Sequence, residues 1–387
     1  MRVLHIGKFY PPYPGGIERA TAELCAALGA RGVRTAVLAH APPGTRHARR
    51  ETREGVEIVL AACHGQLVYA PLSPGFPRLL ARMLREFDPD LLHLHVPNIS
   101  ALSALLLPSA RRRPWIVHWH ADIPVDAHRR TLRVAYRAYR PWEQALLARA
   151  DAIIATSQPY LDSSAALAPW RDKVRVVPLG IADAHTGKRD SASWPMSGLR
   201  ILAVGRLSHY KGFDVLLRAL AQVPEASLIL VGDGECANDL RSLALELQLT
   251  ERVKFAGFVT DEILATLYSS ADLLCLPSLE RSEAFGVVLL EAMRAGLPVI
   301  ASGVRGSGIG YVVRDGATGL LVPPGNVDLL AQALHALRDD PARRQRMGSA
   351  GRQRWREEFT LNRATERMLA LYRDVLQAAR GKAAPIA

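Results

Sequence analysis

The sequence predicts an α/β protein built from two doubly wound, Rossmann-like domains. Three observations lead to this prediction. Short apolar runs rich in β-branched residues alternate with helical patterns, the alternation stops once at a polar stretch, and a second alternating series follows that stretch. Such alternation is typical of a parallel sheet covered by helices on both faces. The length of 387 residues is sufficient for two domains of ordinary size.

The first series spans residues 1–183 and is expected to form the first domain. An expected strand at the start of the chain is followed by an amphipathic helix over residues 18–32. The later expected strands of this series are residues 34–40, 91–96, 115–120, 152–157 and 174–181. Pro11, Pro12 and Pro14 interrupt the short apolar start, so it is interpreted as a strand and not as a targeting segment.

Residues 184–197 are polar, contain Gly, Ser and Pro without periodicity, and are the expected linker. The second domain is expected over residues 198–359, with strands at 199–205, 227–234, 253–258, 272–277 and 298–302. The segment from about residue 360 to 387 is expected to form an amphipathic helix that crosses back to the first domain. Ligands bind beyond the carboxyl ends of the strands in such sheets, so two domains facing each other predict a cleft between them.

Composition limits the class of protein. Hydrophobic residues make up 49% of the chain, which is sufficient for two large cores, and no apolar stretch reaches membrane-spanning length. We therefore expect a cytoplasmic protein. The four cysteines, Cys25, Cys63, Cys236 and Cys275, lack C-x-x-C spacing and are interpreted as reduced core residues.

The net charge of +12 leaves two interpretations open. It reflects either solubility in a host that favours arginine or a surface that attracts anions. Arg133, Arg137 and Arg140 recur at helical spacing beside Tyr136 and Tyr139, which is typical of contact with an anionic membrane surface or an anionic acceptor. A nucleic-acid partner is not expected, because the sequence contains no nucleic-acid-binding motif.

A glycine-containing loop follows the first expected strand of each domain. Gly15 and Gly16 precede the first helix, where the backbone can approach a ligand closely and free N–H groups can face an anion. In the second domain, Arg206 and Lys211 flank one short loop and are candidates to hold a diphosphate together. For both loops, an ordinary solvated turn is the alternative interpretation.

Two glutamates, Glu283 and Glu291, stand eight positions apart near an apolar helical pattern. Glu291 interrupts the apolar run 287–293, and a buried charge without a function is unfavourable, so it is a candidate binding residue. If all eight steps were helical, the two residues would be about 12 Å apart, which is too far for a close acid–base pair.

One D-x-D pattern, at Asp88 and Asp90, has the form that binds metal in metal-dependent transferases. It stands immediately before the strand expected at residues 91–96, and it is interpreted as the start of that strand. No metal site is therefore expected at this pattern.

Histidines recur at alternate positions in two expected strands. His93 and His95 share one face of the first strand, and His118 and His120 share one face of the second. No third ligand is apparent for either pair, so neither is interpreted as a metal site. The candidate contacts for an acceptor in this region are His118, Asp122 and His128.

These pieces, in this order, resemble the family 4 glycosyltransferases of the GT-B fold over nearly the whole chain. The motifs are G-G-x-E at 15–18, G-R-L-x3-K-G at 205–212, V-G-D-G at 231–234, and E-x7-E at 283–291 with the following A-G-x-P-V. Each motif is common alone, whereas the ordered set is specific. The stretch V-H-W-H-A-D-I at 117–123 is similar to bacterial mannosyl- and rhamnosyltransferases of O-antigen and lipopolysaccharide assembly.

The resemblance implies a retaining, metal-independent transfer of a hexose without a cofactor, in which a nucleotide sugar is the co-substrate. The sugar is expected to be mannose or rhamnose from a GDP-sugar. It also implies a glycan or lipid-linked acceptor and a cytoplasmic location, with peripheral contact to the inner face of the plasma membrane. The implied catalytic residues are His120, Glu283, Arg206 and Lys211. The implied donor contacts are Gly15, Gly16, Arg206, Lys211, Phe258, Val259, Glu283, Phe285, Gly286, Val287 and Glu291.

Within this implied set, Arg206 and Lys211 would stabilise the leaving diphosphate, and Glu291 would bind the ribose hydroxyls. Glu283 and His120 would contact the sugar. The chain departs from the family pattern at residues 311–313, where Tyr-Val-Val replaces a stretch with Asn, and at the glycine-rich residues 303–310. Three alternatives stay open: a nucleotide-sugar 2-epimerase of the same fold, a pyridoxal-phosphate-dependent phosphorylase, and a non-catalytic subunit that binds a sugar nucleotide.

Overall fold

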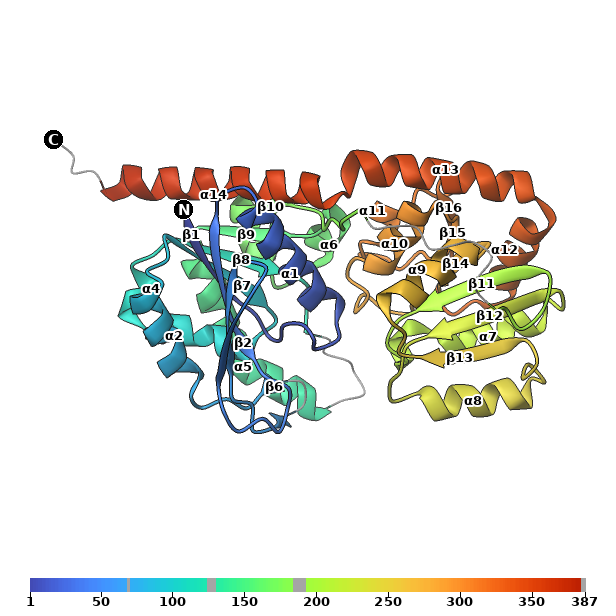
Figure 1. Cartoon of the computed structure of the whole chain (residues 1–387), viewed down its shortest axis with the longest axis horizontal. Coiled ribbons are helices and arrows are strands. Elements are labelled where there is room, and N and C mark those ends of the chain that lie inside the picture. Colours follow the sequence, from blue (N-terminus) through green and yellow to red (C-terminus); the bar gives the residue numbers. More distant parts are fainter. Residues whose placement is uncertain (68–69, 124–129, 184–192, 384–387) are drawn as a thin grey trace. The chain divides into compact units, whose positions relative to one another are not determined.

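The computed structural model describes residues 1–67, 70–123, 130–183 and 193–383 (Figure 1). The chain divides into two compact domains. The first comprises Met1–Ala182 and Leu361–Ala387, and the second comprises Asp183–Thr360. Each domain is built on a mainly parallel sheet with helices on both faces, which confirms the α/β class predicted from the alternation of strands and helices.

The first domain contains an eight-stranded sheet in the order β10-β9-β8-β7-β1-β2-β4-β3. All neighbouring strands are parallel except β3, which pairs antiparallel with β4 at the edge. A separate short hairpin consists of β5 (Gln66–Leu67) and β6 (Ala70–Pro71). The strands of the large sheet are β1 (Arg2–Ile6), β2 (Arg34–His40), β3 (Arg49–Arg53), β4 (Val56–Ala61), β7 (Leu91–Val96), β8 (Trp115–Trp119), β9 (Ala152–Ala155) and β10 (Val174–Val176).

The order of the strands explains why helices cover both faces of this sheet. From β1 the chain passes through α1 to β2, and it later returns through α2 to β7 on the other side of β1. Right-handed crossovers that run in opposite directions place their helices on opposite faces. The helices before the linker are α1 (Gly16–Gly29), α2 (Phe76–Glu86), η1 (Ile99–Leu102), α3 (Ser103–Leu106), α4 (Pro108–Arg111), α5 (Arg130–Arg149), α6 (Gln158–Ser163) and η2 (Ala168–Lys173).

The C-terminal helix α14 (Leu361–Ala383) packs beside α1 on the first domain. Its apolar side chains complete a core between these two helices and the sheet, formed among others by Val3, Leu24, Leu91, Ile116, Met368, Leu369, Tyr372 and Val375. This contact confirms the prediction that the last helix crosses back to the first domain.

The second domain contains a six-stranded parallel sheet in the order β13-β12-β11-β14-β15-β16. The strands are β11 (Leu199–Val204), β12 (Ala226–Val231), β13 (Val253–Gly257), β14 (Leu273–Leu276), β15 (Val299–Ser302) and β16 (Gly319–Val322). The helices are η3 (His209–Lys211), α7 (Phe213–Ala221), α8 (Ala237–Glu246), α9 (Asp261–Ser270), α10 (Val287–Ala295), α11 (Ile309–Val312), α12 (Val327–Asp339) and α13 (Pro341–Glu358).

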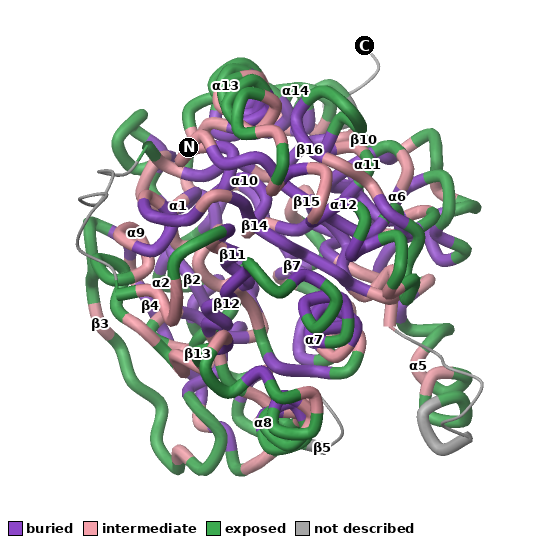
Figure 2. The backbone as a smooth tube through the Cα atoms, turned by 90° about the vertical axis from the view of Figure 1, so that its right-hand side faces the viewer, coloured by how far each residue is buried: buried purple, intermediate pink, exposed green. Residues whose placement is uncertain are grey.

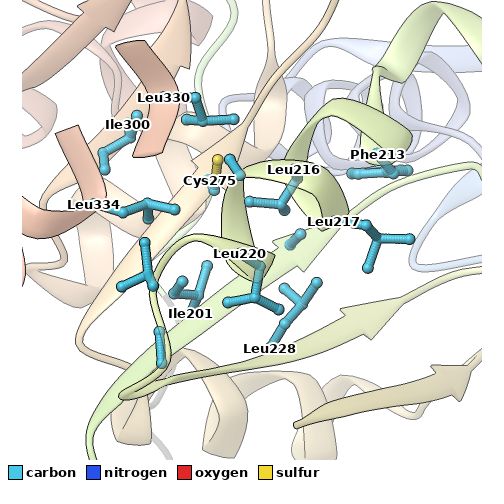
Figure 3. Close-up of a cluster of buried hydrophobic side chains, with 14 of the residues drawn as sticks. Ile201, Phe213, Leu216, Leu217, Leu220, Leu228, Cys275, Ile300, Leu330 and Leu334 are labelled. Atoms are coloured by element: carbon cyan, nitrogen blue, oxygen red, sulfur yellow. The ribbon is translucent and has the colours of Figure 1, made fainter. Parts of the chain in front are cut away.

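One face of the second sheet carries a large apolar core. Leucines of α7 and α12 interdigitate there with side chains of the central strands, among them Ile201, Leu228 and Ile300 (Figure 3). The central strands of both domains are buried along most of their length (Figure 2), as expected for parallel sheets covered on both faces, whereas the edge strands β3 and β13 are largely exposed or half-buried. The core therefore holds the ends of the central strands, and the loops that follow them, in fixed positions.

Two expectations from composition can be compared with the structure. All four cysteines are free; three of them are buried, and Cys236 is half-buried. They are thus mainly small core residues. Among the described residues, no helix combines the length and the apolar character that a membrane crossing requires.

Candidate active site

The order of strands in the second domain locates its binding site. The chain reverses its direction of travel across the sheet between β11 and β14, which are hydrogen-bonded neighbours. In open α/β sheets, ligands bind beyond the carboxyl ends of the strands at such a switch point. Lys211 lies in the loop after β11, and Glu283 lies in the loop after β14.

Lys211 and Glu283 meet at this switch point as a buried ion pair. The Lys211 Nζ atom donates to Glu283 Oε2 at 2.5 Å, and the Ser278 hydroxyl lies 3.3 Å from the same oxygen. Both charged side chains are about nine-tenths buried. Burial alone would lower the pKa of Lys211, but the Glu283 carboxylate outweighs that effect and raises the pKa above its ordinary value. Lys211 therefore stays a cation that can bind an anion.

Glycines allow the Lys211 loop to lie this close to its neighbours. Gly212 adopts a left-handed conformation with φ of 65°, and a Cβ atom there would lie 2.2 Å from the carbonyl oxygen of Pro277. Gly205 has φ of 154°, and a Cβ atom there would lie 3.2 Å from Lys211 Nζ. The glycines that the sequence places around Lys211 thus leave room for its side chain and for the loop after β14.

Arg206 lies in a different environment from Lys211. Its side chain is 61% exposed, and Nε is 3.1 Å from Glu235 Oε2, a carboxylate that is itself half exposed. The sequence placed both cations on one loop but did not reveal Glu235 as a partner. Because an exposed ion pair of this kind contributes little to stability, Arg206 can exchange Glu235 for an anion at small cost.

The helix that follows Glu283 begins later than the spacing of the two glutamates implied. Gly286 is left-handed with φ of 80° and precedes α10, which begins only at Val287. The separation of about 12 Å between Glu283 and Glu291 assumed that all eight steps are helical. That assumption is wrong, because the first steps lie before the helix. Phe285 is buried and packs edge-on against Phe359, so this side chain supports the turn from within the domain.

Glu291 is buried in α10 and has a specific partner. Its Oε2 atom accepts a hydrogen bond from the Tyr268 hydroxyl at 2.7 Å. The phenol orients a carboxylate that interrupts an apolar helix face. A buried carboxylate with a hydrogen-bond donor beside it is suited to accept further hydrogen bonds from hydroxyl groups.

The glycine-rich segment 303–310 supports the Glu283 loop. The Ser307 hydroxyl donates to the backbone oxygen of Glu283, and the Gly308 N–H donates to Ala284 O at 2.8 Å. Gly306 in the same segment is left-handed with φ of 74°. The unusual composition of this segment therefore serves to hold the backbone around Glu283.

The remaining donor candidates of the second domain are exposed to different degrees. Phe258 follows β13 and is 71% exposed, which is unusual for a large apolar residue. Val259 beside it is half-buried, and Thr260 caps the next helix, α9. The arrangement offers an aromatic face to a ligand without further change of the fold.

In the first domain, Gly15 and Gly16 are exposed at the start of α1. A Cβ atom at Gly15 would lie 2.0 Å from Glu18 Oε2, so the Glu18 carboxylate folds back over the helix N-terminus. Burial raises the pKa of Glu18, while a backbone hydrogen bond and Lys8 oppose the rise. The motif G-G-x-E thus places its glutamate directly beside its glycines.

A buried cluster of histidines in the first domain includes one residue beyond the two pairs that the sequence indicated. His5 of β1 joins His93, His95, His118 and His120 in one buried cluster, in which nitrogens of different rings are 2.9 to 3.3 Å apart. The premise that each pair lacks a third potential ligand is therefore wrong, because two sets of three histidines have ring nitrogens within 4.8 Å of one another. The sequence placed His5 in the first expected strand. It did not show that this strand lies beside β7, the strand that carries His93 and His95.

Asp122 and Asp88 have structural partners. Asp122 Oδ1 accepts hydrogen bonds from Trp119 Nε1 at 2.8 Å and from the Ser164 hydroxyl at 2.7 Å. Asp88 pairs with Arg2 and Arg113 at the amino ends of β1 and β8, and β7 begins directly after Asp90. The D-x-D pattern thus precedes a strand, as interpreted. His128 lies outside the described residues.

Glu143 of α5 was not singled out by the sequence. It is fully buried and accepts a hydrogen bond from the Tyr136 hydroxyl at 2.9 Å. Burial raises the pKa of Glu143 to about 7. The hydrogen bond from Tyr136 acts to lower this pKa, and the nearby Asp122 acts to raise it to a smaller extent than burial does. In the unfolded chain the same carboxyl titrates near its ordinary value of 4.5.

This difference predicts a pH-dependent stability. Between the two pKa values the folded state binds the extra proton, so the contribution of Glu143 to stability falls as pH rises through this window and is constant above it. We expect Glu143→Gln to match the parent chain near pH 5 and to exceed it by about 2–3 kcal/mol at pH 8. Urea unfolding of both chains at the two pH values measures this; an equal difference at both would contradict it.

The two domains and their sites define a class of protein. Two doubly wound domains, with a buried lysine–glutamate pair at the switch point of the second, are those of a GT-B glycosyltransferase. Two family models match: a glycosyl transferase 4-like domain over residues 15–180 and glycosyl transferases group 1 over residues 186–354. The chain belongs to the glycosyltransferase family that these two models describe together, and it is an enzyme.

Relatives of known function cover almost the whole chain. The O-antigen chain mannosyltransferase C of Escherichia coli is 28% identical over 97% of this chain and 99% of its own length. The D-rhamnosyltransferase WbpZ of Pseudomonas aeruginosa is 31% identical, with coverage of 93% and 92%. The phosphatidyl-myo-inositol mannosyltransferase of Mycobacterium leprae is 32% identical, with coverage of 91% of both chains.

Solved structures have the same fold. The sucrose-phosphate synthase of Thermosynechococcus elongatus superposes with a TM-score of 0.81, is 26% identical, and matches 97% of this chain and 99% of its own. Anabaena Alr3699/HepE in complex with UDP-glucose superposes with a TM-score of 0.75 at 22% identity, with coverage of 97% and 100%. At that identity the second similarity concerns the fold alone.

Proposed function

We propose that this enzyme transfers mannose or rhamnose from a GDP-sugar to a glycan or lipid-linked acceptor of the cell surface, with retention of the anomeric configuration. The observation that carries the proposal is the buried Lys211–Glu283 pair at the switch point between β11 and β14. A mannosyltransferase and a rhamnosyltransferase that are similar over almost the whole chain support the choice of sugar. A nucleotide sugar as donor is further supported by the UDP-glucose complex of a protein with the same fold.

The proposed roles follow from the charges of the second domain. Lys211 and Arg206 neutralise the diphosphate, and Glu291 accepts hydrogen bonds from the ribose hydroxyls. The N–H groups of Gly286 and Val287, at the start of α10, face the phosphates, as helix N-termini bind anions. Phe258 and Val259 contact the base. Gly15 and Gly16 pack against the donor, and the first domain holds the acceptor.

We propose a front-face transfer without a metal ion or other cofactor. The bond between the anomeric carbon and the diphosphate oxygen breaks while the acceptor hydroxyl forms its bond on the same face. The acceptor proton passes to an oxygen of the leaving phosphate. Positioning and electrostatic stabilisation of the diphosphate are then the main contributions of the protein.

A donor screen followed by product analysis tests this function. A donor present at a hundred times its Kd raises the free energy of unfolding by about 2.7 kcal/mol. A panel of GDP-, UDP- and ADP-sugars can therefore be ranked by thermal shift. The selected donor is then incubated with a lipid-linked glycan acceptor, and the anomeric configuration of the product is read by NMR. Stabilisation by GDP-sugars only, and a product of retained configuration, are expected; an inverted product would overturn the proposed mechanism.

The same assay separates the rival functions. A 2-epimerase converts the donor without any acceptor, so the donor alone is incubated and its sugar analysed. A phosphorylase would need pyridoxal phosphate, which has a characteristic absorbance. A non-catalytic subunit would be stabilised by the donor but would release no nucleoside diphosphate. The expected result is release of nucleoside diphosphate that depends on the acceptor.

We also propose peripheral contact with an anionic membrane through the exposed face of α5. Arg137 and Arg140 are exposed there, and Trp142 beside them is 49% exposed. Basic side chains with an interfacial aromatic residue favour the surface of an anionic bilayer.

Removal of these charges is expected to weaken vesicle binding. For the double variant R137Q/R140Q we expect roughly tenfold weaker co-sedimentation with vesicles that contain anionic lipid, and no change with neutral vesicles. The matched control is R346Q/R356Q, which removes the same charge from exposed positions of α13. Equal losses in both variants would attribute binding to net charge alone and contradict a membrane-binding face on α5.

A further inference from the structure

Arg354 of α13 is a buried cation that does not belong to the proposed donor contacts. The helix packs along α10 in the second domain (Figure 1), and Arg354 is only 9% exposed. Burial lowers the pKa of its guanidinium group, so keeping a charge at this position is unfavourable in itself. An arginine that stays charged in such a place is expected to bind a specific set of hydrogen-bond acceptors.

The acceptors of Arg354 are backbone carbonyls at the end of a short helix. Its Nε atom donates to Val312 O at 3.1 Å, and its Nη2 atom donates to Tyr311 O at 2.8 Å. Both residues belong to the end of α11, and the last carbonyls of a helix lack a partner within it. The guanidinium fork therefore satisfies the carboxyl end of α11, where a positive charge is also favourable.

The amino end of α11 holds the loop that carries Glu283. Gly308, directly before the helix, donates its N–H to Ala284 O at 2.8 Å. The Ser307 hydroxyl donates to the backbone oxygen of Glu283, and it accepts from the N–H of the first residue of α11 at 3.2 Å. The helix α11 therefore connects the Glu283 loop at its amino end with Arg354 at its carboxyl end.

Aromatic rings make a second connection from Arg354 to the same loop. The guanidinium carbon lies 5.1 Å from the centre of the Phe359 ring, within the range of a cation–π interaction. Phe359 is fully buried and packs edge-on against Phe285, with 6.2 Å between the ring centres. Phe285 stands two positions after Glu283 and is itself buried. Two separate sets of contacts thus connect one arginine with the Glu283 loop.

We propose that Arg354 is a positioning residue for Glu283: it fixes α11, and α11 in turn holds the backbone that presents the Glu283 carboxylate. The inference rests on the proposed function for the ligand of Glu283, but not for the position of the loop. Glu283 binds Lys211 Nζ at 2.5 Å, so a shift of its backbone would also move the cation of the diphosphate site. Misplacement of such groups by about 1 Å can lower a rate by about 10².

The alternative is that Arg354 stabilises the second domain as a whole and has no particular effect on the site. The position of its contacts favours the specific role. Both carbonyl acceptors belong to α11, and neither residue is part of the apolar core around α7 and α12. Loss of Arg354 should therefore loosen residues 303–313 and the Glu283 loop before it affects that core.

Hydrogen exchange of the full-length chain tests the position of the loop without reference to activity. Arg354→Met keeps much of the side-chain volume and removes both donors. We expect peptides that cover residues 303–313 to exchange about tenfold faster in this variant, and peptides of α7 and α12 to stay within about twofold of the parent chain. Faster exchange of the whole domain by one common factor would overturn the positioning role, as would unchanged exchange of residues 303–313.

Kinetics of the same variant test the effect on the reaction. We expect Arg354→Met to lower kcat by about ten- to a hundredfold, with the donor KM within about threefold. The split is expected because Glu291 and Phe258, the proposed contacts of ribose and base, lie outside α11. Arg354→Lys keeps the charge but has no fork for two carbonyls, so it should recover only part of kcat. If Arg354→Met does not fold, Arg354→Lys takes its place in both measurements, with smaller effects in the same direction.

The matched control is Met347→Ala on the same helix. Met347 is 2% exposed and packs in the apolar core of the second domain. This variant should lower the midpoint of urea unfolding at least as much as Arg354→Met does, and keep kcat within about twofold. An equal loss of kcat in both variants would show that turnover follows stability and would overturn the role. If the parent chain turns over no donor, the proposed function fails while the exchange result stands.

Discussion

Replacement of Lys211 by alanine is expected to lower kcat by about 10²–10³, because a preorganised cation that stabilises a leaving group is worth about that much. The Lys211 ammonium is buried at the switch point, keeps its charge through Glu283, and lies beyond the end of β11. Turnover is measured with a saturating donor whose binding is confirmed separately. Near-normal turnover of Lys211→Ala with a bound donor would contradict the assignment of Lys211 to the diphosphate.

This variant also has a cost in stability that must be separated from catalysis. Removal of one partner of a buried ion pair leaves the other charge uncompensated, at about 3 kcal/mol or more. The double variant K211M/E283Q removes both charges and should regain much of that stability. We expect it to stay as inactive as Lys211→Ala, whereas recovery of turnover along with stability would show that Lys211 acts only through folding.

The sequence was sufficient to predict both domains, because the period of each apolar run and the single polar interruption determine the class of fold. It also identified Lys211, Glu283 and Glu291 as individual candidates. It could not reveal that Lys211 and Glu283 form one ion pair, since their 72 positions of separation close only when β11 and β14 become neighbours. Pairing across a parallel sheet depends on the strand order, which no local pattern encodes.

The histidines illustrate the same limit. Alternation within one strand correctly placed His93 with His95, and His118 with His120, on shared faces. The contribution of His5 depends on the register between β1 and β7, and the hydrogen bond between His93 and Tyr372 depends on the packing of α14 against the sheet. Likewise, the partner of Glu291 is Tyr268 of the preceding helix, which has no motif of its own. Local motifs therefore predicted the residues, and only the tertiary contacts gave their partners.

The second large effect is expected at Glu291. Hydrogen bonds from ribose hydroxyls to a carboxylate are charge-assisted, and each contributes about 1.5–3 kcal/mol. We therefore expect Glu291→Gln to lower kcat/KM for the donor by about 10–10², mainly through KM, because the ribose is bound alike before and during the transfer. The glutamine fits the same volume in α10 and can still accept from the Tyr268 hydroxyl, so little stability should be lost.

A double-mutant cycle with the donor itself decides whether that loss arises at the ribose. Donors that lack the 2′- or the 3′-hydroxyl are compared with the natural donor on the parent chain and on Glu291→Gln. If Glu291 binds a hydroxyl, the variant loses little further affinity for the donor without that hydroxyl. Tyr268→Phe is the matched control, because it removes the donor that orients Glu291 but keeps the carboxylate, and only a few-fold effect is expected. Equal losses on all three donors would place Glu291 elsewhere than at the ribose, since a contact that does not depend on either hydroxyl cannot be made to them.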